Sequence, residues 1–207
     1  MGQGSYPLEE NRHEGMALTL PVSYLAPVSW YKAFLSEPSP MIEVCESFPR
    51  STLRNRCVIA GTNGVQTLTV PVCKAQSKQL TRDVQVSYQS NWQHQHWQAL
   101  VSAYRHTPYF DYLADMFEPL YQKQTKYLVD LNAAFHEVVM YILLQDKRSY
   151  NLTTDWQEDT DIDRYFDTAE DVKEYYQIFA DKQGFQPNLS VADLLFNMGR
   201  EGERWLK

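Results

Sequence analysis

The first half of the chain is a series of short apolar segments, each about as long as a β-strand. Residues 17–24 and 41–46 are apolar runs, and residues 84–88 alternate apolar and polar positions, as a half-buried strand does. Between the first two runs, residues 27–35 predict a short helix with Pro27 in its first turn. This half of the chain therefore predicts several short strands and one helix.

An Asn63-Gly64 pair lies between two β-rich segments, residues 57–60 and 65–72. Asn-Gly between such segments is typical of a tight turn that joins two antiparallel strands. These two segments are therefore predicted to form a β-hairpin.

From Ser90 onward the apolar positions recur with a helical period. Ser90 and Gln93 form a capping-box pattern at the start of one helix, and Pro108 opens the next. A long helix follows, with one apolar stripe: Leu128, Leu131, Phe135, Val138 and Ile142. Two shorter helices are predicted at residues 171–181 and 190–198.

Strands followed by helices are the pattern of an α+β fold. We expect a small mixed β-sheet in the N-terminal half and a mostly helical C-terminal half. Residues 1–15 are polar and are expected to be a disordered leader. Residues 16–207 are expected to be one α+β domain, because a chain of this length can bury a single large core.

Charge and cysteine content narrow the function classes. The formal net charge of −7 argues against nucleic acid as a partner, because phosphate binding needs clustered Lys and Arg. Cys45, Cys57 and Cys73 lie in apolar stretches without CxxC spacing and are expected to be buried free thiols. Residues 1–15 show no signal peptide, and the strongest apolar run, residues 138–144, is too short for a bilayer. These features predict a cytoplasmic protein without membrane insertion.

Four segments of the chain form an ordered set. They are residues 20–31 (LPVSYLAPVSWY), 54–72 (with RNRCVI and LTVPV), 92–110 (WQHQHWQALVSAY, then PYF) and 184–197 (GFQPNLSVADLLFN). Together they resemble the WbqC-like protein family, which is named after a protein encoded among genes for bacterial surface-polysaccharide synthesis. Many relatives begin with His-Gln-Pro after the first strand, so the Leu20-Pro21-Val22 of this chain puts any role of that histidine in doubt here. The resemblance implies a bacterial protein of surface-glycan assembly that handles a nucleotide-activated sugar.

Arg50, Arg54 and Arg56 form the densest basic cluster, with Asn55 between the last two. Guanidinium groups bind a diphosphate or a carboxylate through two nitrogens. In an extended segment Arg54 and Arg56 would point to the same face and could clamp the anion of a substrate, while Asn55 orients a polar group. The alternative interpretation is ion pairing with acidic residues of the same chain.

His96 falls on the apolar stripe of its helix, with Trp92 one turn before it and Tyr104 two turns after it. A lone histidine in such a place is more often a hydrogen-bonded core residue than a general acid or base. His96, with Tyr104 nearby, is still the best catalytic candidate, because its position matches the family-like segment. His94 lies on another face of the helix, so His-x-His predicts no metal site.

Asn188 and Ser190 precede an apolar run, and Ser190 with Asp193 resembles a capping box. The structural interpretation is a helix start. The functional one is that this helix N-terminus offers backbone N–H groups to an anion, with Asn188 and Ser190 binding the substrate.

An acidic segment resembles an EF-hand calcium loop in the spacing of five residues: Asp159, Asp161, Asp163, Asp167 and Glu170. Arg164 occupies the sixth position, where the loop requires Gly, so a solvated acidic loop is the preferred interpretation. The chain also lacks the GxGxxG, GxxxxGK[ST], Gly-x-Ser-x-Gly and His-Glu-x-x-His motifs, and no cofactor is indicated.

Three functional hypotheses remain open. The first is an enzyme that transfers a group on a nucleotide sugar or a similar anionic, phosphorylated substrate. The second is a non-catalytic binding or scaffold protein of the same pathway. The third is a transferase that uses Cys57, with the charge of Arg56 lowering the pKa of the thiol.

Overall fold

The computed structural model describes most of the chain, in residues 18–49, 52–74, 78–145, 148–156 and 172–207. The expected leader, Arg50 and the EF-hand-like segment all lie outside the described residues. Within them, no helix combines the length and the apolar character needed to cross a membrane.

A parallel β-α-β unit opens the fold, with β1 (Thr19–Pro21), α1 (Val28–Ser36) and β2 (Met41–Glu43). Leu20 lies opposite Ile42, and the far side of β2 pairs with β5 (Asn151–Leu152), also in parallel. The predicted strands at 17–24 and 41–46 are confirmed in shortened form, whereas β5 was not predicted. α1 begins directly after Pro27, whose fixed φ suits the first turn of a helix.

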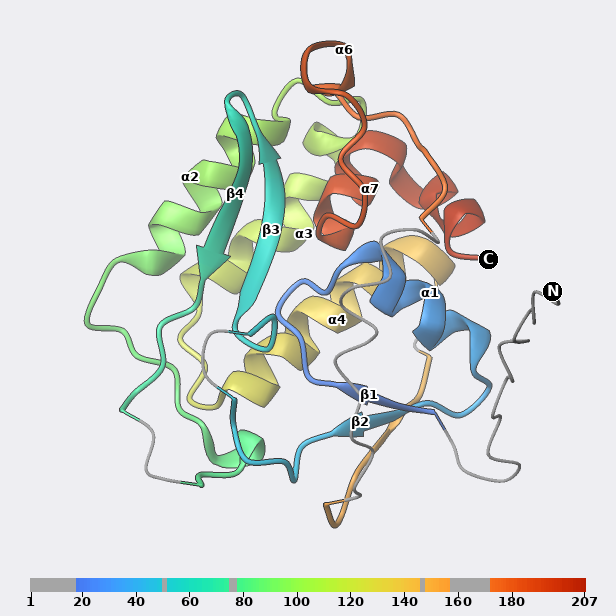
Figure 1. Cartoon of the computed structure of the whole chain (residues 1–207). Coiled ribbons are helices and arrows are strands. Elements are labelled where there is room, and N and C mark those ends of the chain that lie inside the picture. The colour runs from blue at the N-terminus through green and yellow to red at the C-terminus, as the bar shows by residue number, and fades with distance from the viewer. Residues whose placement is uncertain (1–17, 50–51, 75–77, 146–147, 157–171) are drawn as a thin grey trace, which may run out of the picture.

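The predicted hairpin is confirmed, with β3 (Arg56–Gly61) and β4 (Gly64–Thr69) in antiparallel pairing. Gly64 has a φ of 116°, which its missing side chain allows in the tight turn. The strand predicted at 84–88 is wrong, because this segment makes only isolated bridges from Gln85 and Val86 in the described structure. The strands thus form two small sheets, and Figure 1 shows the hairpin standing beside the parallel one.

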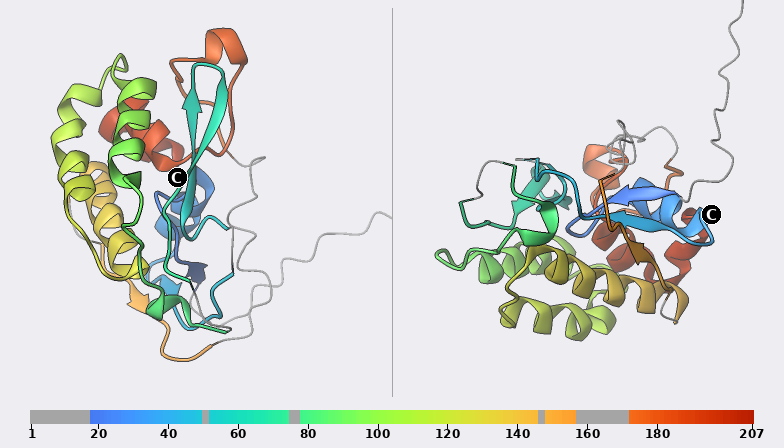
Figure 2. Two further views of the ribbon diagram at one scale, coloured as in Figure 1. Left: turned by 90° about the vertical axis from the view of Figure 1, so that its left-hand side faces the viewer. Right: turned by 90° about the horizontal axis from the view of Figure 1, so that it is seen from below.

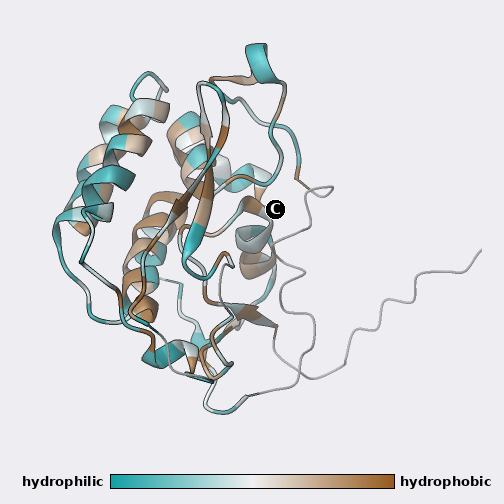
Figure 3. Ribbon diagram, turned by 60° about the vertical axis from the view of Figure 1, so that its left-hand side comes forward, coloured by the Kyte–Doolittle hydropathy of each residue, from teal (hydrophilic) through white to brown (hydrophobic). Residues whose placement is uncertain are grey.

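Three helices, α2 (Trp92–Tyr104), α3 (Phe110–Gln122) and α4 (Leu128–Leu144), form a layer on one side of the strands, as Figure 2 shows. In Figure 3 apolar segments gather on the elements that face the interior, whereas α2 shows hydrophilic residues at the outside. The capping box predicted at Ser90 is wrong, because α2 begins after Asn91 and no side chain caps it. The α+β class is confirmed.

The C-terminal segment is built around α7 (Val191–Met198), which packs in the middle of the molecule. The N-terminus of α7 is hydrogen-bonded to the segment just before α1, since Val191 N–H donates to the Ala26 carbonyl at 2.8 Å. The predicted helix 190–198 and its closure at Gly199 are confirmed. The other short helices of the described residues are η1 (Thr81–Asp83), α6 (Ala180–Gln183) and η3 (Gly199–Trp205).

The helix predicted at residues 171–181 is wrong, because residues 172–177 are irregular and only α6 is helical nearby. The Tyr175 hydroxyl and the Gln177 side-chain amide turn inward, where both donate to Asp193 Oδ2, at 2.7 and 2.9 Å. Tyr175 and Gln177 are two residues apart, and in a helix they would point to different sides. Their shared bond to Asp193 therefore favours the irregular backbone of this segment.

Candidate active site

A pocket opens at the carboxyl ends of the three parallel strands, between α1 and α4. Its enclosed volume is about 90 Å³, and with the solvent-filled mouth the empty space is about 560 Å³. The strand ends contribute apolar side chains, and α1 contributes two aromatic ones: Val22, Val44, Leu152, Trp30 and Tyr31. The carboxyl ends of parallel strands are a recurrent place for ligands in open sheets. A concave, mostly apolar lining with a few polar groups is typical of a small-molecule site.

The imidazole of His136 belongs to the α4 wall of this pocket. The residue is 8% exposed, and its Nδ1 lies 3.3 Å from the Tyr31 hydroxyl. Its ring stacks on that of Tyr31 at 5.6 Å between centroids and meets the edges of other rings, including Phe34 and Tyr150. Burial lowers the pKa of His136 to about 4, so the ring is neutral at pH 7. Its Nε2 has no hydrogen-bond partner among the described residues.

Asn132 lies one helical turn before His136 on the same face of α4. Its Nδ2 donates to the Arg54 carbonyl at 2.8 Å, whereas its Oδ1 has no partner within the described structure. A buried polar atom without a partner costs about 1–3 kcal/mol. Two such atoms on one pocket wall are typical of a place that a water or a ligand fills.

Neither Asn132 nor His136 was predicted from the sequence as a site residue. The signal available was a polar pair at i and i+4 beside the apolar stripe of the longest helix. That pattern gains meaning only when α1 and the strand ends are known to face it.

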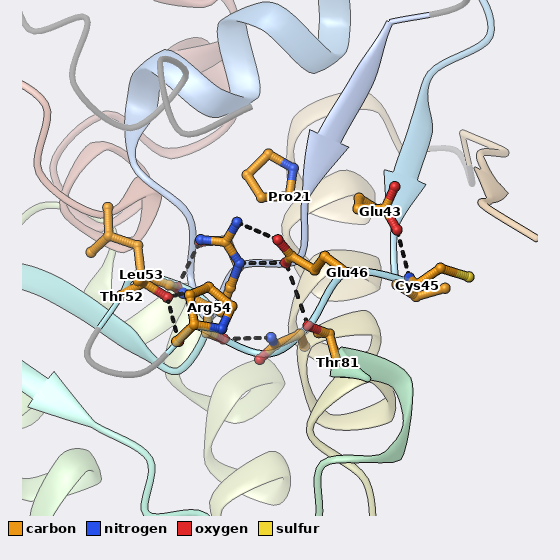
Figure 4. Close-up of polar contacts among 12 residues, drawn as sticks. Pro21, Glu43, Cys45, Glu46, Thr52, Leu53, Arg54 and Thr81 are labelled. Carbon is orange, nitrogen blue, oxygen red and sulfur yellow. Dashed lines mark hydrogen bonds and ion pairs between the residues drawn. The ribbon is translucent and has the colours of Figure 1, made fainter. Parts of the chain in front are cut away.

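Arg54 does not line the pocket but lies in the core, 1% exposed. Its Nε is 2.5 Å from Oε1 of Glu46 and its Nη2 is 2.8 Å from Oε2, as Figure 4 shows. The Thr81 hydroxyl also donates to Glu46, at 3.4 Å. The ion-pairing interpretation describes this geometry, and Arg54 could reach a substrate anion only if Glu46 released it.

The expected common face of Arg54 and Arg56 is wrong, because residues 52–55 form a turn and β3 begins only at Arg56. Asn55 is buried, and its Nδ2 donates to the Val70 carbonyl at 2.8 Å, which ties the turn to the end of β4. Neither Asn55 nor Arg56 belongs to the pocket wall. Their substrate-binding role stays a prediction.

His96 is 5% exposed on α2, away from the pocket. Its Nδ1 lies 3.1 Å from the Tyr24 hydroxyl, which in turn lies 2.9 Å from the Tyr121 hydroxyl. Burial lowers the pKa of His96 to about 4, although a hydrogen bond with the backbone of Thr69 raises it somewhat. The bond of Nδ1 to Tyr24 and the burial of the ring are as expected of a hydrogen-bonded core histidine.

Tyr104 is fully buried, and its hydroxyl accepts the Ala60 N–H at 3.0 Å. The phenol also faces Asp193, a carboxyl group with no exposed surface. Burial raises the pKa of Asp193 to about 6, and hydrogen bonds from Tyr175, Tyr104 and Gln177 oppose that rise. Asp193 is therefore the centre of a buried polar network rather than the capping-box acid predicted from the sequence. His96 and Tyr104 do not share a pocket wall, and their catalytic role stays a prediction.

Asn188 and Ser190 make structural contacts at two helix starts. Asn188 Oδ1 accepts the Ser29 N–H in the first turn of α1 at 2.9 Å. The Ser190 hydroxyl donates to the Leu25 carbonyl at 2.7 Å and accepts the Ala192 N–H at 3.3 Å. The helix-start interpretation is confirmed for Ser190, and neither residue lines the pocket.

The cysteines differ from the expectation in one case. Cys45 and Cys57 are buried free thiols as predicted, but Cys73 is exposed. Burial raises the pKa of the Cys57 thiol well above its ordinary value, so the predicted lowering by Arg56 is wrong. In the part of the chain that the structure describes, no group of three or more His, Cys, Asp or Glu side chains is placed to hold a metal ion.

The comparison with protein families confirms the resemblance seen in the sequence. The model of the WbqC-like protein family matches residues 44–164, over half of the chain, and the chain belongs to this family. No curated protein and no solved structure matches it. The matched segment includes α4 with Asn132 and His136, whereas β1 and α1 precede it.

Proposed function

We propose that the protein is a cytoplasmic enzyme of bacterial surface-polysaccharide precursor synthesis. It binds a nucleotide-activated sugar, or a similar phosphorylated substrate, and takes part in a group transfer on it. The observation that carries the proposal is the pocket wall of α4, where aromatic rings surround His136 and where His136 Nε2 and Asn132 Oδ1 have no hydrogen-bond partner among the described residues. Membership of the WbqC-like family supports the polysaccharide context.

The charge of the pocket indicates which part of the substrate enters it. None of the described lining residues is Lys or Arg, and Asp130 is the only charged one. An ionised phosphate inside would lose its hydration without gaining a counter-charge, which is costly. The uncharged sugar therefore enters the pocket, held by His136 and Asn132, and the phosphates stay in water at the mouth.

Thermal melting against a panel of nucleotides, nucleotide sugars and acyl-CoAs tests this proposal. A ligand at a hundred times its Kd adds about 2.7 kcal/mol, which raises the Tm of a chain of this size by roughly 5–10 °C. The His136→Phe variant keeps an aromatic ring but removes both nitrogens, and we expect it to lose the shift. His96→Phe is the matched control, because His96 is equally buried but lies away from the pocket. Loss of the shift in His96→Phe alone would instead support the catalytic assignment to His96 and Tyr104.

A second candidate function is a non-catalytic binding or scaffold protein of the same pathway. The exposed rings of Tyr112 on α3 and Tyr141 on α4, at 78% and 55%, favour it, since exposed aromatic residues are enriched at protein interfaces. A flat ligand panel combined with one stoichiometric protein partner in a pull-down would support this candidate.

A further inference from the structure

We propose that the pocket recognises a secondary amide with a small apolar substituent, the N-acylamino group of a sugar. The inference deepens the proposed function, on which it rests for the sugar that carries the amide. It follows from the hydrogen-bonding capacity that remains on the α4 wall once every existing bond of His136 and Asn132 is assigned.

The tautomer of His136 is set by Tyr31. The Tyr31 hydroxyl is buried, 2% exposed, and His136 Nδ1 is its hydrogen-bond partner in the described structure. If Nδ1 carried the proton, both the Tyr31 hydrogen and the Nε2 lone pair would be left without partners. If Tyr31 donates to Nδ1, only the Nε2–H is left without one. Each buried orphan group costs about 1–3 kcal/mol, so the second arrangement is favoured and Nε2 is a donor.

Asn132 supplies the complementary group. Its Nδ2 is used by the Arg54 carbonyl, which fixes Oδ1 as the acceptor that remains. A donor and an acceptor thus lie one turn apart on α4. The N–H and C=O of a trans amide point in opposite directions, so an amide placed between the two side chains pairs with both.

Other polar groups fit this wall less well. An ammonium group has donors only and a carboxylate has acceptors only, so each leaves one of the two side chains unsatisfied. Both would also bring a charge into the pocket, where Asp130, the only charged residue of the described lining, is exposed to solvent. The acyl methyl group, by contrast, finds apolar neighbours in Val22, Ile42 and Val44.

Access to the two atoms requires one side chain to move, because His136 Nε2 and Asn132 Oδ1 are covered. Tyr150 lies against the edge of the His136 ring, with 5.2 Å between centroids. It is half-buried, whereas Trp30, Tyr31 and Phe34 around the same ring are buried. Rotation of Tyr150 is therefore the movement that admits the ligand.

Saturation-transfer NMR with N-acetylglucosamine and N-acetylgalactosamine, each compared with the parent sugar glucose or galactose, tests the inference. We expect the N-acetyl methyl protons to receive saturation, and the parent sugars to bind at least about fivefold more weakly, as the loss of one hydrogen bond predicts. Asn132→Leu and His136→Phe should abolish the methyl signal, and His94→Phe, at an exposed position of α2, should keep it. Equal binding of parent sugars, no binding of any of the four, or a methyl signal that survives in both pocket variants would overturn the inference.

Two further readings keep this test independent of folding defects and of the proposed function. The ¹⁵N shifts of His136 in the unmodified protein should show Nε2–H, and an Nδ1–H tautomer would overturn the inference even if the variants do not fold. A nucleotide sugar without an N-acyl group whose thermal shift depends on His136 would leave the proposed function standing and contradict the amide alone. Binding of the N-acetyl sugars without any response to nucleotide sugars would leave the amide inference standing and contradict the proposed function alone.

Discussion

Asn188 caps a helix that lies at the other end of the chain, since its Oδ1 accepts the Ser29 N–H of α1 at 2.9 Å. Asn188 itself has a positive φ of 55°, a conformation that Asn tolerates better than most residues. Asn188 was predicted from the sequence to bind substrate, but in the structure its side chain caps α1. A capping role predicts a loss of stability on substitution, and a substrate-binding role predicts a loss of affinity.

Asn188→Ala should lower the free energy of unfolding by about 2 kcal/mol, because it removes the cap and leaves a side chain at positive φ. Asn188→Gly, the matched control, removes only the cap and should cost about 1 kcal/mol. Urea denaturation measures both. A variant that keeps its stability but binds the nucleotide sugar more weakly would show that Asn188 contacts substrate.

Glu46→Gln should destabilise the protein by about 3–5 kcal/mol, because it removes the carboxylate that pairs with the buried guanidinium of Arg54. Glu203→Gln is the control, since Glu203 pairs with Lys207, whose side chain is 69% exposed, and should cost under about 1 kcal/mol. Denaturation at neutral pH compares them. If Glu46→Gln were as mild as the control, Arg54 would not depend on Glu46 and its anion-binding role would gain support.

Acid should destabilise the protein through the two histidines that are buried in the described structure. The pKa of both His96 and His136 is about 4 in the folded state, against about 6.5 when unfolded. Their stabilising contribution is complete above pH 6.5 and is lost as the pH falls towards 4, because only the unfolded chain then takes up protons. Each loss amounts to at most about 3 kcal/mol.

Unfolding free energies of His136→Phe at pH 7.5 and pH 4.5 check this prediction. The variant should lose part of the pH dependence, whereas His94→Phe, at an exposed position of α2, should retain all of it. Identical pH profiles for the two variants would contradict the prediction.

Asp193 should act in the opposite direction. Its pKa rises from 3.8 to about 6 on folding, so its contribution is complete below pH 3.8 and is lost as the pH rises through 6. Asp193→Asn removes that loss, and the stability of the variant relative to the parent should improve by about 2 kcal/mol between pH 4.5 and pH 7.5. A difference that does not change with pH would contradict the raised pKa of Asp193.

A thiol reagent should modify Cys73 in the folded protein and should reach Cys45 and Cys57 only after unfolding. The reason is exposure, together with the raised pKa of the buried Cys57, since the thiolate is the reactive form. Mass spectrometry of the labelled peptides measures the order. Rapid labelling of Cys57 in Cys73→Ser would revive the hypothesis of a cysteine-dependent transferase.

The parts of the fold that the sequence predicted are those specified by neighbouring residues. Asn63-Gly64 specifies a turn, and the apolar period of residues 128–144 specifies a helix, whatever packs against them. Residues 172–177 failed as a helix because Asp193, far along the chain, draws Tyr175 and Gln177 inward. β5 was not predicted, because a strand of two residues is too short to show an alternation of apolar and polar positions.

The candidate site was beyond sequence reasoning for the same reason. His136 becomes a pocket residue only through its contacts with Tyr31 of α1 and with Tyr150, and no local pattern reports them. His96, by contrast, was correctly placed on an apolar helix face, but the sequence could not show that the Tyr24 hydroxyl is the partner of its Nδ1. The same residue type on two helix faces thus has two different environments.

The parallel pairing of Met41 with Asn151, and the bridge between Pro27 and Ser190, have a consequence for synthesis on the ribosome. β2 can pair with β5 only after residue 151 has been synthesised, and folding that depends on contacts between distant residues is slow. A nascent chain therefore exposes apolar pocket residues such as Trp30 and Val44 until almost the whole sequence has emerged. Over that interval the growing chain is a client for chaperones, and a product truncated before Ser190 would not complete the fold.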